Sequence, residues 1–154
     1  MNAAQFFDQW NPAWRDLMRA VSMLKDSQLE FRPSEQYERS VGGILRHIMN
    51  LERGWIHFVI RRQYEDWPLE DADSLNSVRA LRDEMNRVHA DTMEYLETID
   101  VEDFNRIVQV PDDGTPKLGW ILWHVFEQQI HHRGELFLCL NLLGYQRPKT
   151  DRPG

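Results

Sequence analysis

The chain is poor in cysteine and lacks long apolar runs. Among its 154 residues there is one cysteine, Cys139, so no internal disulfide can form and no oxidising compartment is required. No segment reaches the roughly 18 uninterrupted apolar residues that a membrane-spanning helix needs. The N-terminus also lacks the basic and then apolar pattern of a signal peptide. These absences predict a cytoplasmic protein with no membrane partner.

Clusters of basic residues are missing as well. The 18 lysines and arginines are outnumbered by 25 acidic residues, which gives a formal net charge of −7. A chain without a basic patch repels phosphate backbones and anionic lipids, so nucleic acid is not an expected partner. There is no glycine-rich phosphate loop, no serine nucleophile elbow and no CxxC pair. Nucleotide and hydrolase chemistry therefore have no support in the sequence.

Helical periodicity accounts for most of the chain. Apolar residues recur three and four apart, and no stretch shows the sustained alternation of a β-strand. The composition, 42% hydrophobic and 28% charged, is typical of a single globular domain, here residues 1–154 with about 3–144 ordered. The sequence predicts an all-α four-helix bundle, and the longer links before the second and before the fourth helix permit a crossover topology. The expected helices cover residues 3–24, 40–63, 74–99 and 119–143.

Polar residues interrupt the apolar stripe of the last expected helix. His124, Gln128 and His132 are spaced four apart, so they rise along one helix face in steps of about 6 Å, with His131 beside them. Burying an amide or an imidazole costs a few kcal/mol unless hydrogen bonds or metal coordination compensate. The second helix carries His47 between apolar neighbours. We therefore expect His47 and the polar groups of the last helix to face one another inside the bundle.

Two interpretations of these polar groups follow from the residues alone. A histidine from one helix and a pair at i and i+4 from another can bind one divalent ion in a bundle core. Equally, a histidine on an apolar face can be a core residue that one hydrogen-bond partner satisfies. His57 and His89 lie nearer the polar faces of their helices, and we expect both at the surface.

Two segments carry a resemblance to a known family. Residues 44–55 (ILRHIMNLERGW), followed by 119–127 (GWILWHVFE) and 131–135 (HHRGE), resemble the DinB-like (DinB/YfiT) superfamily. The resemblance extends over nearly the whole chain and implies a four-helix bundle that is commonly a homodimer. It also implies a divalent ion held by three histidines, of which two correspond to His47 and His132. The third position, four residues before His132, is Gln128 here.

The glutamine at this position leaves three outcomes open. Gln128 can complete a weakened site through its carbonyl oxygen, a poorer ligand than imidazole for Zn²⁺ or Ni²⁺. His124 or His131 can replace it, with Glu127 or Glu135 assisting. Alternatively the ion is lost, and Gln128 hydrogen-bonds across the bundle to His47 and His132, because an amide both donates and accepts.

Two functions remain in competition. Some members of the superfamily are metal-dependent transferases that add a small thiol of the bacillithiol or mycothiol type to an electrophile. The resemblance implies this activity, with Trp55, Trp120 and Trp123 either lining a pocket for the electrophile or forming core and dimer contacts. The alternative is a non-catalytic, dimeric stress or small-ligand-binding protein whose metal site has degenerated. The sequence does not identify a substrate.

Overall fold

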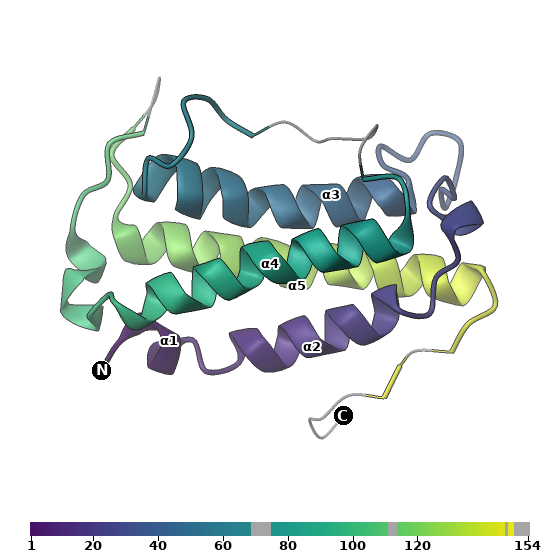
Figure 1. Cartoon of the computed structure of the whole chain (residues 1–154), viewed down its shortest axis with the longest axis horizontal. Coiled ribbons are helices and arrows are strands. Elements are labelled where there is room, and N and C mark those ends of the chain that lie inside the picture. The colour runs from purple at the N-terminus through teal and green to yellow at the C-terminus, as the bar shows by residue number, and fades with distance from the viewer. Residues whose placement is uncertain (69–74, 111–113, 147, 150–154) are drawn as a thin grey trace.

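The computed structural model describes residues 1–68, 75–110, 114–146 and 148–149. Helices dominate these residues, and no strand is found among them beyond two isolated bridges. Figure 1 shows the long helices packed side by side along one axis. The elements are α1 Ala3–Phe6, α2 Trp10–Val21, η1 Asp26–Gln28, α3 Val41–Leu51, η2 Glu52–Ile60, α4 Val78–Glu97, η3 Val101–Asn105 and α5 Leu118–Leu142. The predicted all-α bundle is confirmed.

Local chemistry sets the helix ends. The side chain of Ser40 accepts a hydrogen bond of 3.1 Å from the backbone N–H of Gly43, and this caps α3. Ser77 caps α4 in the same way through the N–H of Ala80. Gly144 follows α5 with a φ of 92°, a left-handed conformation that glycine adopts without strain. The third expected helix begins at Val78, and Ser74 lies outside the described residues.

The helices are connected by a crossover. Figure 1 shows α2 running antiparallel to α4, and α3 running antiparallel to α5. Trp14 contacts Asn86 and His89 at the first of these interfaces, and His47 contacts His132 at the second. α3–η2 and α4 run in the same direction (Figure 1). Two consecutive long helices that run in parallel make this a crossover topology, as the sequence permits, but the crossover precedes α4 and not the second or the fourth expected helix. Its consequence is that α5 packs against α2 on one side and α3–η2 on the other.

η2 continues α3 as a π-helix of nine residues. A π-helix bonds i to i+5 and is wider than an α-helix, and such turns are frequent at functional sites. The first residue of η2 is Glu52, whose side chain is completely buried. The change of helix type therefore coincides with a buried carboxylate.

A polar layer divides the core into two apolar parts. One cluster contains residues of α2 from Trp14 onward, α3, the first half of α4 and the last turns of α5. The other contains α1, Trp10, η2, the end of α4 and the first turns of α5. Between them lie the buried polar side chains Glu52, His57, His89, Thr92, Gln129 and His132. Across the described residues, no helix is both long and apolar enough to cross a membrane.

Candidate metal centre and the buried polar layer

His47 and His132 meet between α3 and α5. Their ring centroids are 4.6 Å apart, and the rings are perpendicular. His132 is buried, whereas His47 is half-buried at the edge of the same interface. The structure thus brings together two of the residues that the resemblance assigns to a metal.

The two nitrogens of His132 have different surroundings. Nδ1 faces a carboxylate oxygen of Glu135, one turn later on α5, and carboxylates accept hydrogen bonds, so Nδ1 carries the proton. Nε2 is buried and has no hydrogen-bond partner among the described residues. An unpaired buried nitrogen is costly, and it is the kind of donor atom that a metal ion satisfies. The Tyr37 hydroxyl donates to the other carboxylate oxygen of Glu135.

The electrostatics suit a neutral His47. Burial, together with the nearby Arg39 cation and His132, lowers the pKa of His47 to about 4, against the opposing effect of Glu135. His47 is therefore uncharged at neutral pH, which is the form that ligates a metal. Burial alone would raise the pKa of Glu135, but the hydrogen bonds from Tyr37 and His132 outweigh it and hold the pKa below its usual value. Glu135 is thus a carboxylate.

A second set of possible ligand atoms overlaps this pair. His131, His132 and Glu135 each place one such atom within 4.8 Å of the others. His131 is exposed, and its ring centroid lies 5.0 Å from that of His132. The described residues therefore offer two ways to hold an ion at His132: across the helix interface with His47, or along α5 with His131 and Glu135.

Gln128 and His124 lie on the same helix but in different surroundings. Gln128 is half-buried one turn before His132. His124 stacks on Trp120 at 4.8 Å and lies 5.5 Å from Trp55, ring centroid to ring centroid. His124 is eight residues from His132, roughly 12 Å along the helix axis.

Four of the six tryptophans, Trp55, Trp67, Trp120 and Trp123, lie near the N-terminal end of α5, away from the histidine pair. Trp55 contacts Trp67 and Trp120, whereas Trp123 packs on Phe7 and Phe126. Trp120 and Trp123 are each about half exposed, at 52% and 54%. This aromatic group covers the end of the bundle and does not border His47 and His132.

The most connected group in the core is one that the sequence interpretation missed. Glu52 accepts hydrogen bonds at 2.8 Å from His89 Nδ1, at 2.7 Å from Gln129 Nε2 and at 2.8 Å from the Thr92 hydroxyl. Trp10 Nε1 donates to the Gln129 oxygen at 2.7 Å. Each of α2, η2, α4 and α5 thus contributes to one buried network, which we call the Glu52 network: Trp10, Glu52, His57, His89, Thr92 and Gln129.

The expectation that His57 and His89 lie at the surface is wrong. They are only 3% and 4% exposed. His57 Nε2 lies 3.0 Å from the Thr92 hydroxyl oxygen, and Arg61 lies 3.0 Å from His57 Nδ1. Since the hydroxyl proton of Thr92 goes to Glu52, the hydroxyl oxygen accepts from His57 Nε2–H and Arg61 donates to Nδ1. The reason for the error is that α4, which carries His89, is covered by both α2 and η2. His57 is buried because it lies on η2 and packs against α4.

One signal for the network was present in the sequence. On α5 the spacing of four, three and four connects Val125, Gln129, His132 and Leu136, and all four are buried. The glutamine of the buried face is therefore Gln129, while its neighbour Gln128 points to the edge. The burial of Glu52 could not be predicted from such a spacing, because a glutamate in a helix is usually exposed to solvent.

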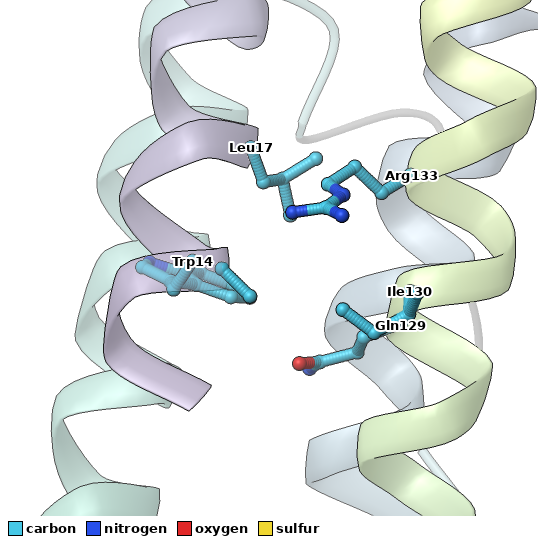
Figure 2. Close-up of a pocket in the computed structure, with 6 residues that line it drawn as sticks. Trp14, Leu17, Gln129, Ile130 and Arg133 are labelled. Atoms are coloured by element: carbon cyan, nitrogen blue, oxygen red, sulfur yellow. The ribbon is translucent and has the colours of Figure 1, made fainter. Parts of the chain in front are cut away.

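A small pocket separates α2 from α5 beside this network. Figure 2 shows Trp14 and Leu17 on α2 opposite Gln129, Ile130 and Arg133 on α5. Its volume is about 10 Å³, which is room for about one water molecule. The Arg133 guanidinium lies 3.5 Å from the buried carboxylate of Asp16. This pocket is too small for an organic substrate.

Comparisons with known proteins agree on the family. The sequence profile of the DinB family matches residues 1–154. A DinB-like protein from Bacillus cereus ATCC 10987 has a similar structure, with a TM-score of 0.80, 16% identity and 97% of each chain covered. A DinB-like protein from Bacillus subtilis gives a TM-score of 0.75 at 15% identity, covering 97% of this chain and 99% of its own. No curated protein matches. The chain, an all-α bundle with a histidine pair at its α3–α5 interface, belongs to the DinB family.

Proposed function

We propose that this DinB-family protein binds one divalent ion, Zn²⁺ or Ni²⁺, between α3 and α5 through His47 and His132, with Gln128 as a weak third ligand. The observation that carries the proposal is the buried Nε2 of His132, which lacks a hydrogen-bond partner among the described residues and belongs to a ring that contacts the His47 ring. We propose further that the ion serves the transfer of a small thiol to an organic electrophile.

The donor set fits a catalytic site better than a structural one. Structural zinc sites use four protein ligands, whereas catalytic sites use three and leave a position open. Two imidazoles and one amide oxygen would leave such a position. A divalent ion held there would supply Lewis acidity, which would lower the pKa of a thiol bound at the open position. Because an amide oxygen is a poor ligand for these ions, the affinity is expected to be modest.

The thiol must come from a substrate. Cys139 is buried, and burial together with the Glu135 carboxylate raises the pKa of its thiol above the usual value. A buried thiol with a raised pKa is a poor nucleophile. His47 stays neutral and Glu135 stays ionised. The described residues thus provide two candidate imidazole ligands, and Cys139 is not suited to be the reacting group.

A non-catalytic dimer is the second candidate, and the outer face of α5 supports it. Trp120, Trp123, Leu138 and Leu142 are 48–55% exposed along this helix. A Cβ atom added at Gly134, between them, would meet nothing within 4 Å. An exposed apolar helix face with a glycine at its centre suits close packing against a second copy. In this alternative the histidines are core residues and no ion is bound.

Metal content decides between the two. The untagged protein, purified without chelator, should contain up to one Zn²⁺ or Ni²⁺ per chain by elemental mass spectrometry, and His47→Ala should contain none. Thiol-transfer assays with bacillithiol or mycothiol and a panel of small electrophiles then follow. If the protein takes up no ion from excess Zn²⁺, Ni²⁺ or Mn²⁺, the transferase proposal fails and the dimeric binding protein remains.

A further inference from the structure

Glu135 uses both of its carboxylate oxygens within the protein. One oxygen accepts the proton of His132 Nδ1, and the other accepts the Tyr37 hydroxyl proton. Tyr37 comes from the segment between η1 and α3, whereas the other two residues are on α5. A chain of two hydrogen bonds therefore runs from this segment, through the carboxylate, to the imidazole of His132.

We propose that Glu135 is a positioning residue and not a metal ligand: it holds His132 with its proton on Nδ1, so that Nε2 faces His47. Tyr37 fixes Glu135 in turn. The part concerning the ion rests on the proposed function, while the position of the proton on His132 can be tested without any metal. With Glu135 in this role, an ion at His132 has His47 as its other imidazole ligand, and His131 is not a ligand.

The hydrogen bonding supports this choice. If Glu135 moved to bind an ion with His131 and Nδ1 of His132, it would give up its hydrogen bond with that nitrogen. Nε2 of His132 would then remain buried and unpaired, which is unfavourable. If Glu135 stays where it is, an ion bound at Nε2 satisfies the one unpaired nitrogen. A carboxylate on the far nitrogen also makes the imidazole a stronger ligand.

Tyr37 remains a donor over the physiological range. The hydrogen bond to Glu135 and burial raise the pKa of Tyr37 to about 12. Its hydroxyl therefore keeps its proton, and one carboxylate oxygen is always occupied. A carboxylate held in this way cannot rotate its second oxygen away from His132 without also losing Tyr37.

The first test measures the proton position in metal-free protein. Long-range ¹H–¹⁵N NMR at about pH 8, where imidazoles are mostly neutral, distinguishes the two forms of a histidine ring. We expect the His132 signals, assigned by their absence in His132→Gln, to show a protonated Nδ1 and a bare Nε2. In Glu135→Ala the ring should shift toward the Nε2–H form that free histidine prefers. A protonated Nε2 in the wild-type protein would overturn the proposal.

The second test measures Co²⁺ and Zn²⁺ affinity by titration. Glu135→Gln should bind ten- to a hundredfold more weakly, as is typical when an outer partner of a histidine ligand is replaced. The visible bands of bound Co²⁺ should keep their positions, because the ligands are unchanged. His131→Ala is the matched control and should bind as the wild type does. Shifted Co²⁺ bands in Glu135→Gln, or an equal loss in His131→Ala, would instead make Glu135 and His131 ligands.

The outcomes separate this proposal from the proposed function. If the wild-type protein binds neither Co²⁺ nor Zn²⁺, the metal-dependent function fails, and the NMR result alone decides whether Glu135 positions His132. If the wild type binds the ion but His132 carries its proton on Nε2, the function survives and the positioning role of Glu135 does not. Tyr37→Phe should weaken Co²⁺ binding less than Glu135→Gln, since it removes only the outer hydrogen bond.

Discussion

The carboxylate of Glu52 lies 2.8 Å from Nδ1 of His89, in the middle of the bundle and out of contact with solvent. The other imidazole nitrogen of His89 lies 2.8 Å from the side-chain oxygen of Asn11. Both nitrogens thus lie at hydrogen-bond distance from side-chain oxygens of other helices. Trp14 stacks on the ring of His89 at 4.2 Å. A buried hydrogen-bonded pair of this kind favours one register of the helices, because any other register would leave the buried Glu52 carboxylate without partners.

Glu52→Gln should therefore destabilise the protein strongly at neutral pH. Removing one partner of a buried, hydrogen-bonded pair typically costs about 3–5 kcal/mol of unfolding free energy. Chemical denaturation at pH 7 measures it. Glu84→Gln is the control, since Glu84 pairs with Arg87 near the surface and such pairs are worth at most about 1 kcal/mol. Similar losses in the two variants would show that the Glu52 network contributes nothing special.

The contribution of Glu52 should vanish in acid. Burial would raise the pKa of Glu52, but the His89 charge and the hydrogen bonds from His89, Gln129 and Thr92 lower it below its ordinary value of 4.5. A folded-state pKa below the unfolded one gives stability that is present above pH 4.5 and lost as the pH falls through the folded value. The difference between wild type and Glu52→Gln should thus be constant near pH 7 and shrink below about pH 4.5. A difference that grows in acid would contradict this sign.

His132→Ala should lower the amount of bound metal more than tenfold. The variant removes His132, which is the one residue that both possible ligand sets at this position share. Elemental analysis after dialysis against Zn²⁺ or Ni²⁺ measures the effect, with circular dichroism to confirm that the helices persist. Unchanged metal content would remove His132 from the ligand set. His124→Ala is a suitable control, because His124 stacks on Trp120 away from the pair.

Gln128→His should raise the metal affinity. The position is half-buried one turn before His132, so an imidazole there adds a ligand at the i, i+4 spacing. Imidazole binds Zn²⁺ and Ni²⁺ more strongly than an amide oxygen does. Calorimetric titration of both proteins with Zn²⁺ compares the two dissociation constants. No gain in affinity would indicate that another residue already closes the site.

Gly134→Ala distinguishes an exposed α5 face from a buried one. The new Cβ would meet nothing within 4 Å in a single chain, and alanine is favoured over glycine in a helix by about 0.5–1 kcal/mol. If the protein is a monomer, the variant should unfold at a higher denaturant concentration. If two copies pack closely at this glycine, light scattering should instead show a weaker dimer.

Some elements of the fold could be predicted from single residues. Ser40 and Gly144 mark the start of α3 and the end of α5 because a serine hydroxyl caps backbone N–H groups and glycine accepts a positive φ. His47 and His132 stood out because each interrupts an apolar helical stripe. In contrast, the burial of His57 and His89 could not be predicted, since it depends on which elements cover α4.

The sequence by itself determined the helices, their caps and the two histidines that face each other, because these follow from local conformational preferences and periodic burial. The tertiary structure decided that Gln129, and not Gln128, enters the core. It also decided that Glu52 is hydrogen-bonded to residues of α4 and α5, and through Gln129 is connected to Trp10 of α2. It also decided that Glu135 occupies one nitrogen of His132 and leaves the other unpaired. These relations depend on the rotation and register of whole helices. The packing of the complete bundle sets both, whereas a one-dimensional pattern records only which residues share a face.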